Sequence, residues 1–262
     1  MIAMSVEASK PVGAAGGRLV GAGRAHRIVD GVRYVILAAA GLGLMLTGCT
    51  VSATGRPVAA PDLGHWQPPP ILNARLGNLL LSASDVDAVG QTTNMALRRP
   101  ISEMSHSEDI VSDRNCLDAF SPIEAAVYRD GSWVALQGQF LDNAHSQDQR
   151  KHALLQAVVR FRDADLAQQF FRQAKPRWST CANQPLTISQ PGDAPITWTL
   201  GELVATDTTL SIVQTLDGGH GFACQRGVGV RNNVIIDTLW CGFDTTNQAG
   251  EVVTKIAAAV QA

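Results

Sequence analysis

The sequence of 262 residues contains five cysteines, and their spacing limits the chemistry that they can perform. Four of them, Cys116, Cys181, Cys224 and Cys241, are separated by 65, 43 and 17 residues, so the C-x-x-C pairs typical of zinc sites are absent. The spacing therefore disfavours a metal site, and no cofactor is predicted. In an oxidising compartment, four such cysteines would form two disulfides, for which three pairings are possible.

The fifth cysteine, Cys49, follows a segment with the order of an export signal. Basic residues ending at Arg33 precede an uncharged apolar run, residues 34–47, which is shorter than the roughly 20 residues that cross a membrane. The L-T-G-C tetrapeptide that ends at Cys49 resembles the bacterial lipobox. We therefore expect residues 1–48 to be a lipoprotein signal peptide, and a lipidated Cys49 to anchor the chain on the extracytoplasmic face of the cell membrane. The alternatives are an ordinary signal peptide with an incidental cysteine, or an internal membrane helix.

The segment after Cys49 has the composition of a tether. Residues 50–70 contain five prolines and no apolar periodicity, so residues 49–70 are predicted to be an extended link between the lipid and a folded domain. Residues 49–262 contain 16 basic and 21 acidic residues, a net charge of minus five, without a basic run. Nucleic acid is therefore not an expected partner.

Residues 71–262 are predicted to form a single α+β domain in which helices back an antiparallel sheet. Short turns join most of the strand patterns, and a parallel crossover needs a dozen or more residues. Helices are predicted at residues 163–175, where Pro176 is expected to end the helix, and at about residues 248–260. The predicted strands are residues 133–140, 154–161, 196–200, 203–206, 210–216, 222–230 and 234–241.

One predicted hairpin, residues 221–242, resolves the pairing of the cysteines. The Asn232-Asn233 pair suits a two-residue turn, because asparagine tolerates positive φ. Counting outward from the turn, the eighth cross-strand pair is Cys224 with Cys241, at a non-hydrogen-bonded position where side chains lie closest. Cys116 and Cys181 are then left to each other, with two free buried thiols or a metal site as the alternatives.

The same hairpin places two kinds of residues on opposite faces. Gly227 and Gly229 lie on the face opposite the disulfide and leave a hollow that either a ligand or a packed helix could fill. On the disulfide face, Arg226 lies diagonal to Asp237, and this spacing favours a structural ion pair.

The sequence contains no recognisable catalytic motif. G-x-S-x-G, H-E-x-x-H, a P-loop and a dinucleotide-binding glycine pattern are all absent, and the histidines after residue 48 lie at unrelated positions. We therefore expect a protein that is not an enzyme. A nucleophile within reach of a histidine would favour the alternative, a cryptic hydrolase.

Several short motifs resemble, in order and spacing, the PknH-like extracellular sensor domain family over about residues 79–260. This family includes the outer domain of a mycobacterial serine/threonine kinase and stand-alone lipoproteins. The motifs are Leu79-Leu80-Leu81-Ser82, Gly131-Ser132-Trp133, Gln137-Gly138-Gln139, Ala157-Val158-Val159, Phe170-Phe171, Trp178-x-x-Cys181, Cys224-Gln225-Arg226 and Asn232-Asn233-Val234.

The resemblance implies a twisted antiparallel sheet, two disulfides and a V-shaped cleft for an unidentified ligand. The sequence holds no kinase domain, so we expect it to bind or sense and not to phosphorylate. The expected ligand is a small molecule, a glycan or a lipid, and the alternative is an interaction module for another envelope protein. Polar residues at matching positions are expected to face the cleft: Gln139, Gln225, Arg231 and Asn233.

Overall fold

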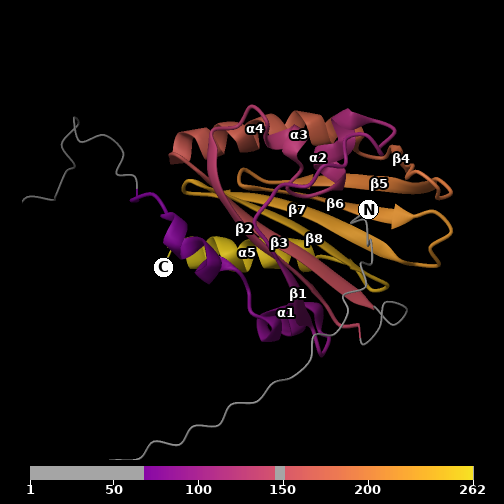
Figure 1. Ribbon diagram of the computed structural model, residues 1–262, viewed down its shortest axis with the longest axis horizontal. Coiled ribbons are helices and arrows are strands. Elements are labelled where there is room, and N and C mark those ends of the chain that lie inside the picture. Colours follow the sequence, from indigo (N-terminus) through magenta and orange to yellow (C-terminus); the bar gives the residue numbers. More distant parts are fainter. Residues whose placement is uncertain (1–67, 145–150, 262) are drawn as a thin grey trace, which may run out of the picture. The chain divides into compact units, whose positions relative to one another are not determined.

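The computed structural model describes residues 68–144 and 151–261 of the chain (Figure 1). The predicted signal peptide, Cys49 and nearly all of the predicted tether lie outside these residues. The expected lipidation is therefore not addressed by the structure.

The described residues contain one sheet of eight strands, and every neighbouring pair is antiparallel. The strand order is β1-β2-β3-β8-β7-β6-β5-β4, so the predicted hairpin forms part of the centre of the sheet. The predicted α+β class is confirmed. The strands are β1 (Ala96–Ile101), β2 (Trp133–Asp142), β3 (His152–Phe161), β4 (Pro185–Ile188), β5 (Ile196–Ala205), β6 (Thr209–Leu216), β7 (Ala223–Arg231) and β8 (Val234–Gly242).

Helices cover both faces of this sheet (Figure 1). On one face lie α2 (Leu117–Phe120), α3 (Ala125–Tyr128) and α4 (Ala164–Cys181), next to the 3-10 helix η2 (Arg114–Cys116). On the other face lie the 3-10 helix η1 (Asn73–Leu79), α1 (Ala83–Gly90) and α5 (Gln248–Gln261). Because strand side chains alternate between faces, the central strands contribute to two separate hydrophobic cores.

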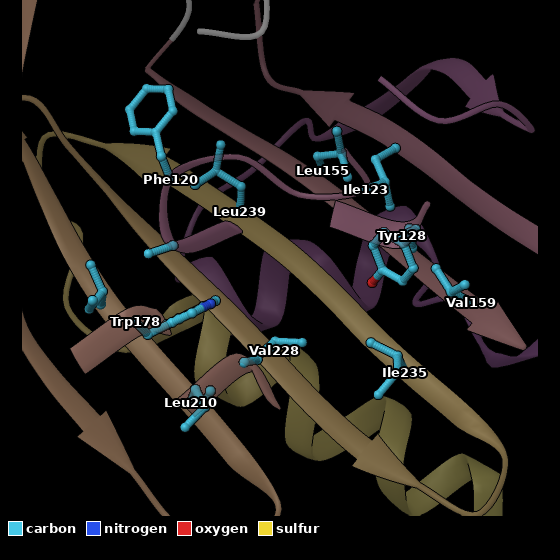
Figure 2. Close-up of a cluster of buried hydrophobic side chains, with 14 of the residues drawn as sticks. Phe120, Ile123, Tyr128, Leu155, Val159, Trp178, Leu210, Val228, Ile235 and Leu239 are labelled. Atoms are coloured by element: carbon cyan, nitrogen blue, oxygen red, sulfur yellow. The ribbon is translucent and has the colours of Figure 1, made fainter. Parts of the chain in front are cut away.

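The two cores differ in composition. The core under α2, α3 and α4 is rich in aromatic side chains, among them Phe120, Tyr128 and Trp178 (Figure 2). The core under η1, α1 and α5 is mainly aliphatic, although Trp240 is fully buried in it. The buried apolar residues of α5 form part of this second core.

Three details of the secondary structure differ from the sequence prediction. The strands predicted at residues 196–200 and 203–206 are one strand, β5, whose register shifts between Leu200 and Leu203. The edge strands β1 and β4 were not predicted, because β1 is mostly exposed and lacks an alternating pattern and β4 is only four residues long.

The third difference is that Pro176 does not end its helix. A proline removes one backbone hydrogen bond from a helix interior, and Pro176 is exposed, where this loss is tolerated best. The helix continues because the next turn buries Trp178 and Cys181 completely. The gain from this burial outweighs the local cost of the proline.

Both predicted disulfides are present. Cys116 and Cys181 have Cα atoms 5.5 Å apart and join η2 to the end of α4. Cys224 and Cys241 have Cα atoms 4.0 Å apart and face each other across β7 and β8. The predicted register of this hairpin is confirmed without a bulge.

A helix fills the predicted hollow on the glycine face of the hairpin. A Cβ on Gly227 would lie 2.8 Å from Thr238 Oγ1 and 3.2 Å from the Cβ of Ala249, and a Cβ on Gly229 would overlap the side chain of Val253. Ala249 and Val253 belong to α5. Of the two interpretations of this face, helix packing is therefore correct, because only glycine lets α5 approach the strand so closely.

Candidate functional site

A hollow of about 280 Å³ lies beside the C-terminal half of α5, next to the start of β6 and the end of β7. Its floor is apolar and comes mainly from α5. Its rim carries hydroxyl groups and one cation, and none of its described lining residues is acidic. The residues that define it are Thr208, Thr209, Arg231, Val253, Thr254 and Ala257.

Arg231 is the group in this hollow best suited to bind a ligand. Its side chain is exposed, and its guanidinium lies against the side-chain amide of Gln261 in the last turn of α5. By contrast, the hydroxyl of Thr254 already donates to the carbonyl of Gly250 at 2.9 Å. A guanidinium offers several N–H donors in a plane and binds carboxylate, phosphate and sugar oxygens. The hollow therefore suits a ligand that presents acceptor oxygens above a small apolar part.

Gln225, one of the four predicted site residues, is buried and hydrogen-bonded to the start of α5. Its Oε1 accepts the backbone N–H of Ala249 at 2.9 Å, and its Nε2 donates to Asn247 Oδ1 at 3.3 Å. Unpaired N–H groups at the start of a helix need such acceptors. Gln225 thus positions the first turn of α5 on the sheet.

Gln139 and Asn233 also bind main-chain groups inside the domain. Gln139 Nε2 donates to the carbonyl of Leu81 at 2.7 Å, and Asn233 Oδ1 accepts the N–H of Ile71 at 2.7 Å. The four predicted residues therefore do not converge on one cleft. Arg231 alone lines the hollow, and the predicted role in ligand binding stays a prediction.

A second cluster brings a hydroxyl to a histidine, the arrangement that would favour a hydrolase. Thr92 Oγ1 lies 3.2 Å from Nδ1 of His152, whose Nε2 lies 2.8 Å from the carboxylate of Asp244. Thr92 lies in the segment after α1, His152 begins β3, and Asp244 lies in the connection after β8. No sequence pattern indicates this cluster, because the three residues are far apart in the chain.

The amide of Asn143 engages the nitrogen of His152 that would have to act as the catalytic base. Asn143 Oδ1 accepts the N–H of His152 at 3.0 Å, which fixes the orientation of the amide. Its Nδ2 then lies 3.1 Å from His152 Nδ1 and 3.2 Å from Thr92 Oγ1, and it can only donate. Since the lone pair of Nδ1 is engaged, His152 is not free to take the proton of Thr92. The cluster ties three segments together and does not form an activated nucleophile.

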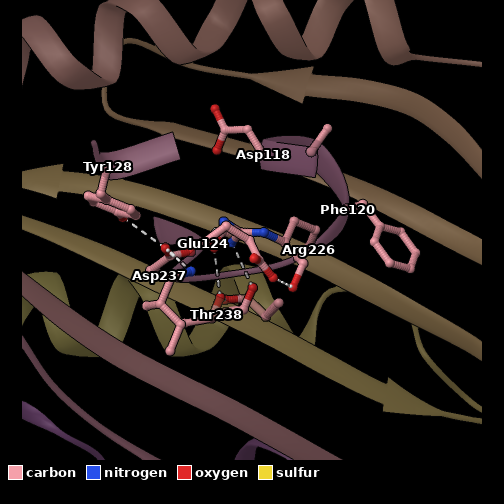
Figure 3. A network of polar contacts seen from close by, with 12 residues as sticks. Asp118, Phe120, Glu124, Tyr128, Arg226, Asp237 and Thr238 are labelled. Atoms are coloured by element: carbon pink, nitrogen blue, oxygen red, sulfur yellow. Dashed lines mark hydrogen bonds and ion pairs between the residues drawn. The ribbon is translucent and has the colours of Figure 1, made fainter. Parts of the chain in front are cut away.

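The predicted ion pair between Arg226 and Asp237 is confirmed and lies in the core (Figure 3). Both residues are only 1% exposed. Arg226 Nη1 donates to the carbonyls of Gly227 at 2.7 Å and Thr238 at 3.0 Å, and its guanidinium lies over the ring of Trp178. Because both side chains are buried from solvent and bind groups inside the domain, we assign the pair a structural role.

Asp237 extends the ion pair to the helices above the sheet. Its Oδ2 accepts the N–H of Ile123 at 2.9 Å and the hydroxyl of Tyr128 at 2.8 Å (Figure 3). Burial raises the pKa of Tyr128 well above its ordinary value, and the charge of Asp237 raises it further. The carboxylate therefore holds α3 and the turn before it against the centre of the sheet.

Two further features are not found among the described residues. No group of three or more His, Cys, Asp or Glu in this part of the chain could hold a metal ion. Within the same residues, no helix is long and apolar enough to span a membrane.

Comparison with known proteins identifies close relatives of this domain. The PknH-like extracellular domain family matches residues 72–259. The serine/threonine-protein kinases PknH of Mycobacterium tuberculosis CDC 1551 and of Mycobacterium bovis are 32% and 33% identical to the chain over 229 residues. These matches cover 87% of this chain, but only 34% and 36% of the two kinases. The chain thus spans about a third of the length of the curated relatives it matches.

A solved structure supports the same relationship. The crystal structure of the extracellular domain of PknH from Mycobacterium tuberculosis superimposes with a TM-score of 0.70 at 31% sequence identity. The match covers 74% of this chain and 98% of that domain.

Tyr128 gives a test of the buried network, because it is the only tyrosine after Tyr34. Unfolded tyrosine ionises near pH 10, whereas folded Tyr128 stays neutral to higher pH. Its contribution to stability is therefore complete below about pH 10 and is lost as the pH rises toward the pKa of the folded state. In the chain from residue 49, we expect the ultraviolet absorbance of tyrosinate to appear only as the protein unfolds.

The matched variant is Tyr128→Phe, which removes both the hydroxyl and its titration. We expect its free energy of unfolding at neutral pH to fall by about 1.5–3 kcal/mol, since a hydrogen bond to a buried carboxylate is lost. Above about pH 10, its stability should decrease less steeply than that of the parent chain. Tyrosinate absorbance at pH 10 in the still folded parent would contradict this account.

Proposed function

The chain belongs to the family of PknH-like extracellular domains, and from this premise we propose that it is a lipid-anchored sensor that binds a ligand without converting it. The observation that carries the proposal is the hollow at Arg231, which combines an exposed guanidinium with an apolar floor inside a sensor-type domain. The described histidine cluster lacks an available base, which supports binding over catalysis.

The proposed ligand presents carboxylate, phosphate or hydroxyl oxygens to Arg231. Envelope lipids, glycans and muropeptides all carry such groups, and the small apolar floor selects ligands with a short apolar part beside them. Among the described residues, the large exposed apolar side chains lie on separate segments: Leu72, Leu97, Val134, Val204 and Phe243. These side chains support the alternative function, an interaction module for an envelope protein, less strongly than the hollow supports ligand binding.

The proposed anchor is a lipid on Cys49, joined to the domain by residues 49–70. The extracellular location of the matched domain family supports export of the chain. Two or more acyl chains would hold it durably on the membrane surface.

Acylation of Cys49 predicts a specific mass. We expect protein extracted from membranes to begin at Cys49 and to carry acyl groups, as measured by intact mass spectrometry. Cys49→Ala should abolish processing or release the protein, whereas Cys116→Ala tests for a nonspecific effect of cysteine loss. Normal processing and membrane retention of Cys49→Ala would refute the anchor.

Ligand binding at the hollow is tested by thermal stabilisation of the chain from residue 49. A ligand at 100 times its dissociation constant stabilises the folded state by about 2.7 kcal/mol. We expect Arg231→Gln to lose this stabilisation while its melting temperature without ligand stays close to that of the parent. Arg172→Gln, an exposed arginine on α4, is the matched control and should bind normally. Equal binding by Arg231→Gln, or turnover of the ligand by a residue of the domain, would overturn the proposal.

A further inference from the structure

The first described segment crosses the sheet as a strap, defined here as residues 69–82. It contains η1, which packs on β2, β3 and α5, and it ends where α1 begins. Only three of its side chains are buried, those of Ile71, Leu76 and Leu79. The strap does not pair with any strand of the described sheet. Its attachment to the domain therefore depends on a few side chains.

The first attachment is the side-chain amide of Asn233, which is fully buried at the start of β8. Its Oδ1 accepts the N–H of Ile71 at 2.7 Å, and its Nδ2 donates to the carbonyl of Ile71 at 3.2 Å and to that of Phe161 at 2.9 Å. The amide thus satisfies both main-chain groups of one residue, as a neighbouring strand would.

The second attachment lies at the other end of the strap and uses the same chemistry. Gln156 Oε1 accepts the N–H of Leu81 at 3.0 Å, and its Nε2 donates to the carbonyl of Leu81 at 2.9 Å. Gln139, the residue paired with Gln156 on β2, donates to the same carbonyl at 2.7 Å. A buried glutamine on a sheet face is costly unless it is hydrogen-bonded, so the fully buried Gln156 needs such a partner. Gln139 is half-buried.

We propose that Gln139, Gln156 and Asn233 form a binding site for peptide main chain, here called the amide site, and that the strap occupies this site reversibly. The strap opens as one unit before the sheet does, because it has few buried side chains and no strand pairing. Its N-terminal end continues into the predicted tether, so a pull on the tether acts first on Pro69, whose carbonyl accepts from Asn232 Nδ2 at 2.8 Å, and then on Ile71. The effect of a pull on the tether rests on the proposed lipid anchor, whereas the amide site does not depend on that anchor.

The backbone N–H groups of Ile71 and Leu81 report directly on opening of the strap, because their acceptors are the side-chain amides of Asn233 and Gln156. Hydrogen exchange of both is measured by NMR on the folded chain from residue 49 with Cys49→Ser, which lacks any acyl group. We expect both to exchange at least about tenfold faster than the central amides of β3 and β8. The outcome does not depend on acylation or on Arg231, so it is separable from the proposed function.

Two variants test whether the strap opens as a unit. Gln156→Leu removes the contact at Leu81 and should accelerate exchange at distant Ile71 as well as at Leu81, by about tenfold for the loss of one or two hydrogen bonds. Asn233→Ala removes the contact at Ile71 and should likewise accelerate hydrogen exchange at distant Leu81. If one of the two variants fails to fold, the other still tests the proposal.

Gln214→Leu is the matched control. Gln214 is a buried glutamine on β6 that donates to the carbonyls of Ala119 at 3.1 Å and Phe120 at 2.8 Å, on the opposite face of the sheet. Its loss should leave exchange at Ile71 and Leu81 unchanged. Equal acceleration by Gln214→Leu, acceleration confined to the mutated end, or exchange as slow as that of the sheet would each overturn the proposal.

Discussion

The buried ion pair between Arg226 and Asp237 is the interaction on which the arrangement of this domain depends. Each charge lies on one of two paired central strands, β7 and β8, and neither reaches water. A buried ion pair needs further hydrogen bonds to compensate for the water that its charges lose. That requirement fixes Ile123 and Tyr128 against Asp237, and Trp178 over Arg226. The pair therefore determines where the short helices and α4 lie on this face.

The opposite face of the sheet is held by neutral side-chain amides and by a mainly aliphatic core. Neutral amides position η1, the turn before α1 and the start of α5, and glycines on β7 let α5 approach. The hollow at Arg231 lies on this face, at the end of the same hairpin. One face thus carries the buried ion pair and both disulfides, while the other, which carries the candidate site and the strap, is held by neutral amides and apolar packing.

The sequence predicted those features that local geometry determines. The Asn232-Asn233 turn sets the register of β7 and β8, and this register yields one disulfide directly, the other by elimination, and the ion pair. Features set by tertiary packing were not predictable. Pro176 was expected to end a helix that burial extends, and the cluster around His152 joins residues distant in the chain. Asn233 was expected in a cleft, yet it binds a segment whose course the sequence does not reveal.

A double-mutant cycle across the ion pair tests most directly whether it determines this arrangement. Urea unfolding would compare the parent chain with Arg226→Met, Asp237→Leu and the double variant. We expect each single variant to lose about 3–5 kcal/mol of stability, because one charge stays buried without its partner, and the double variant to recover a large part of that loss. Single losses below about 1 kcal/mol, or a double loss equal to the sum of the two, would contradict this account.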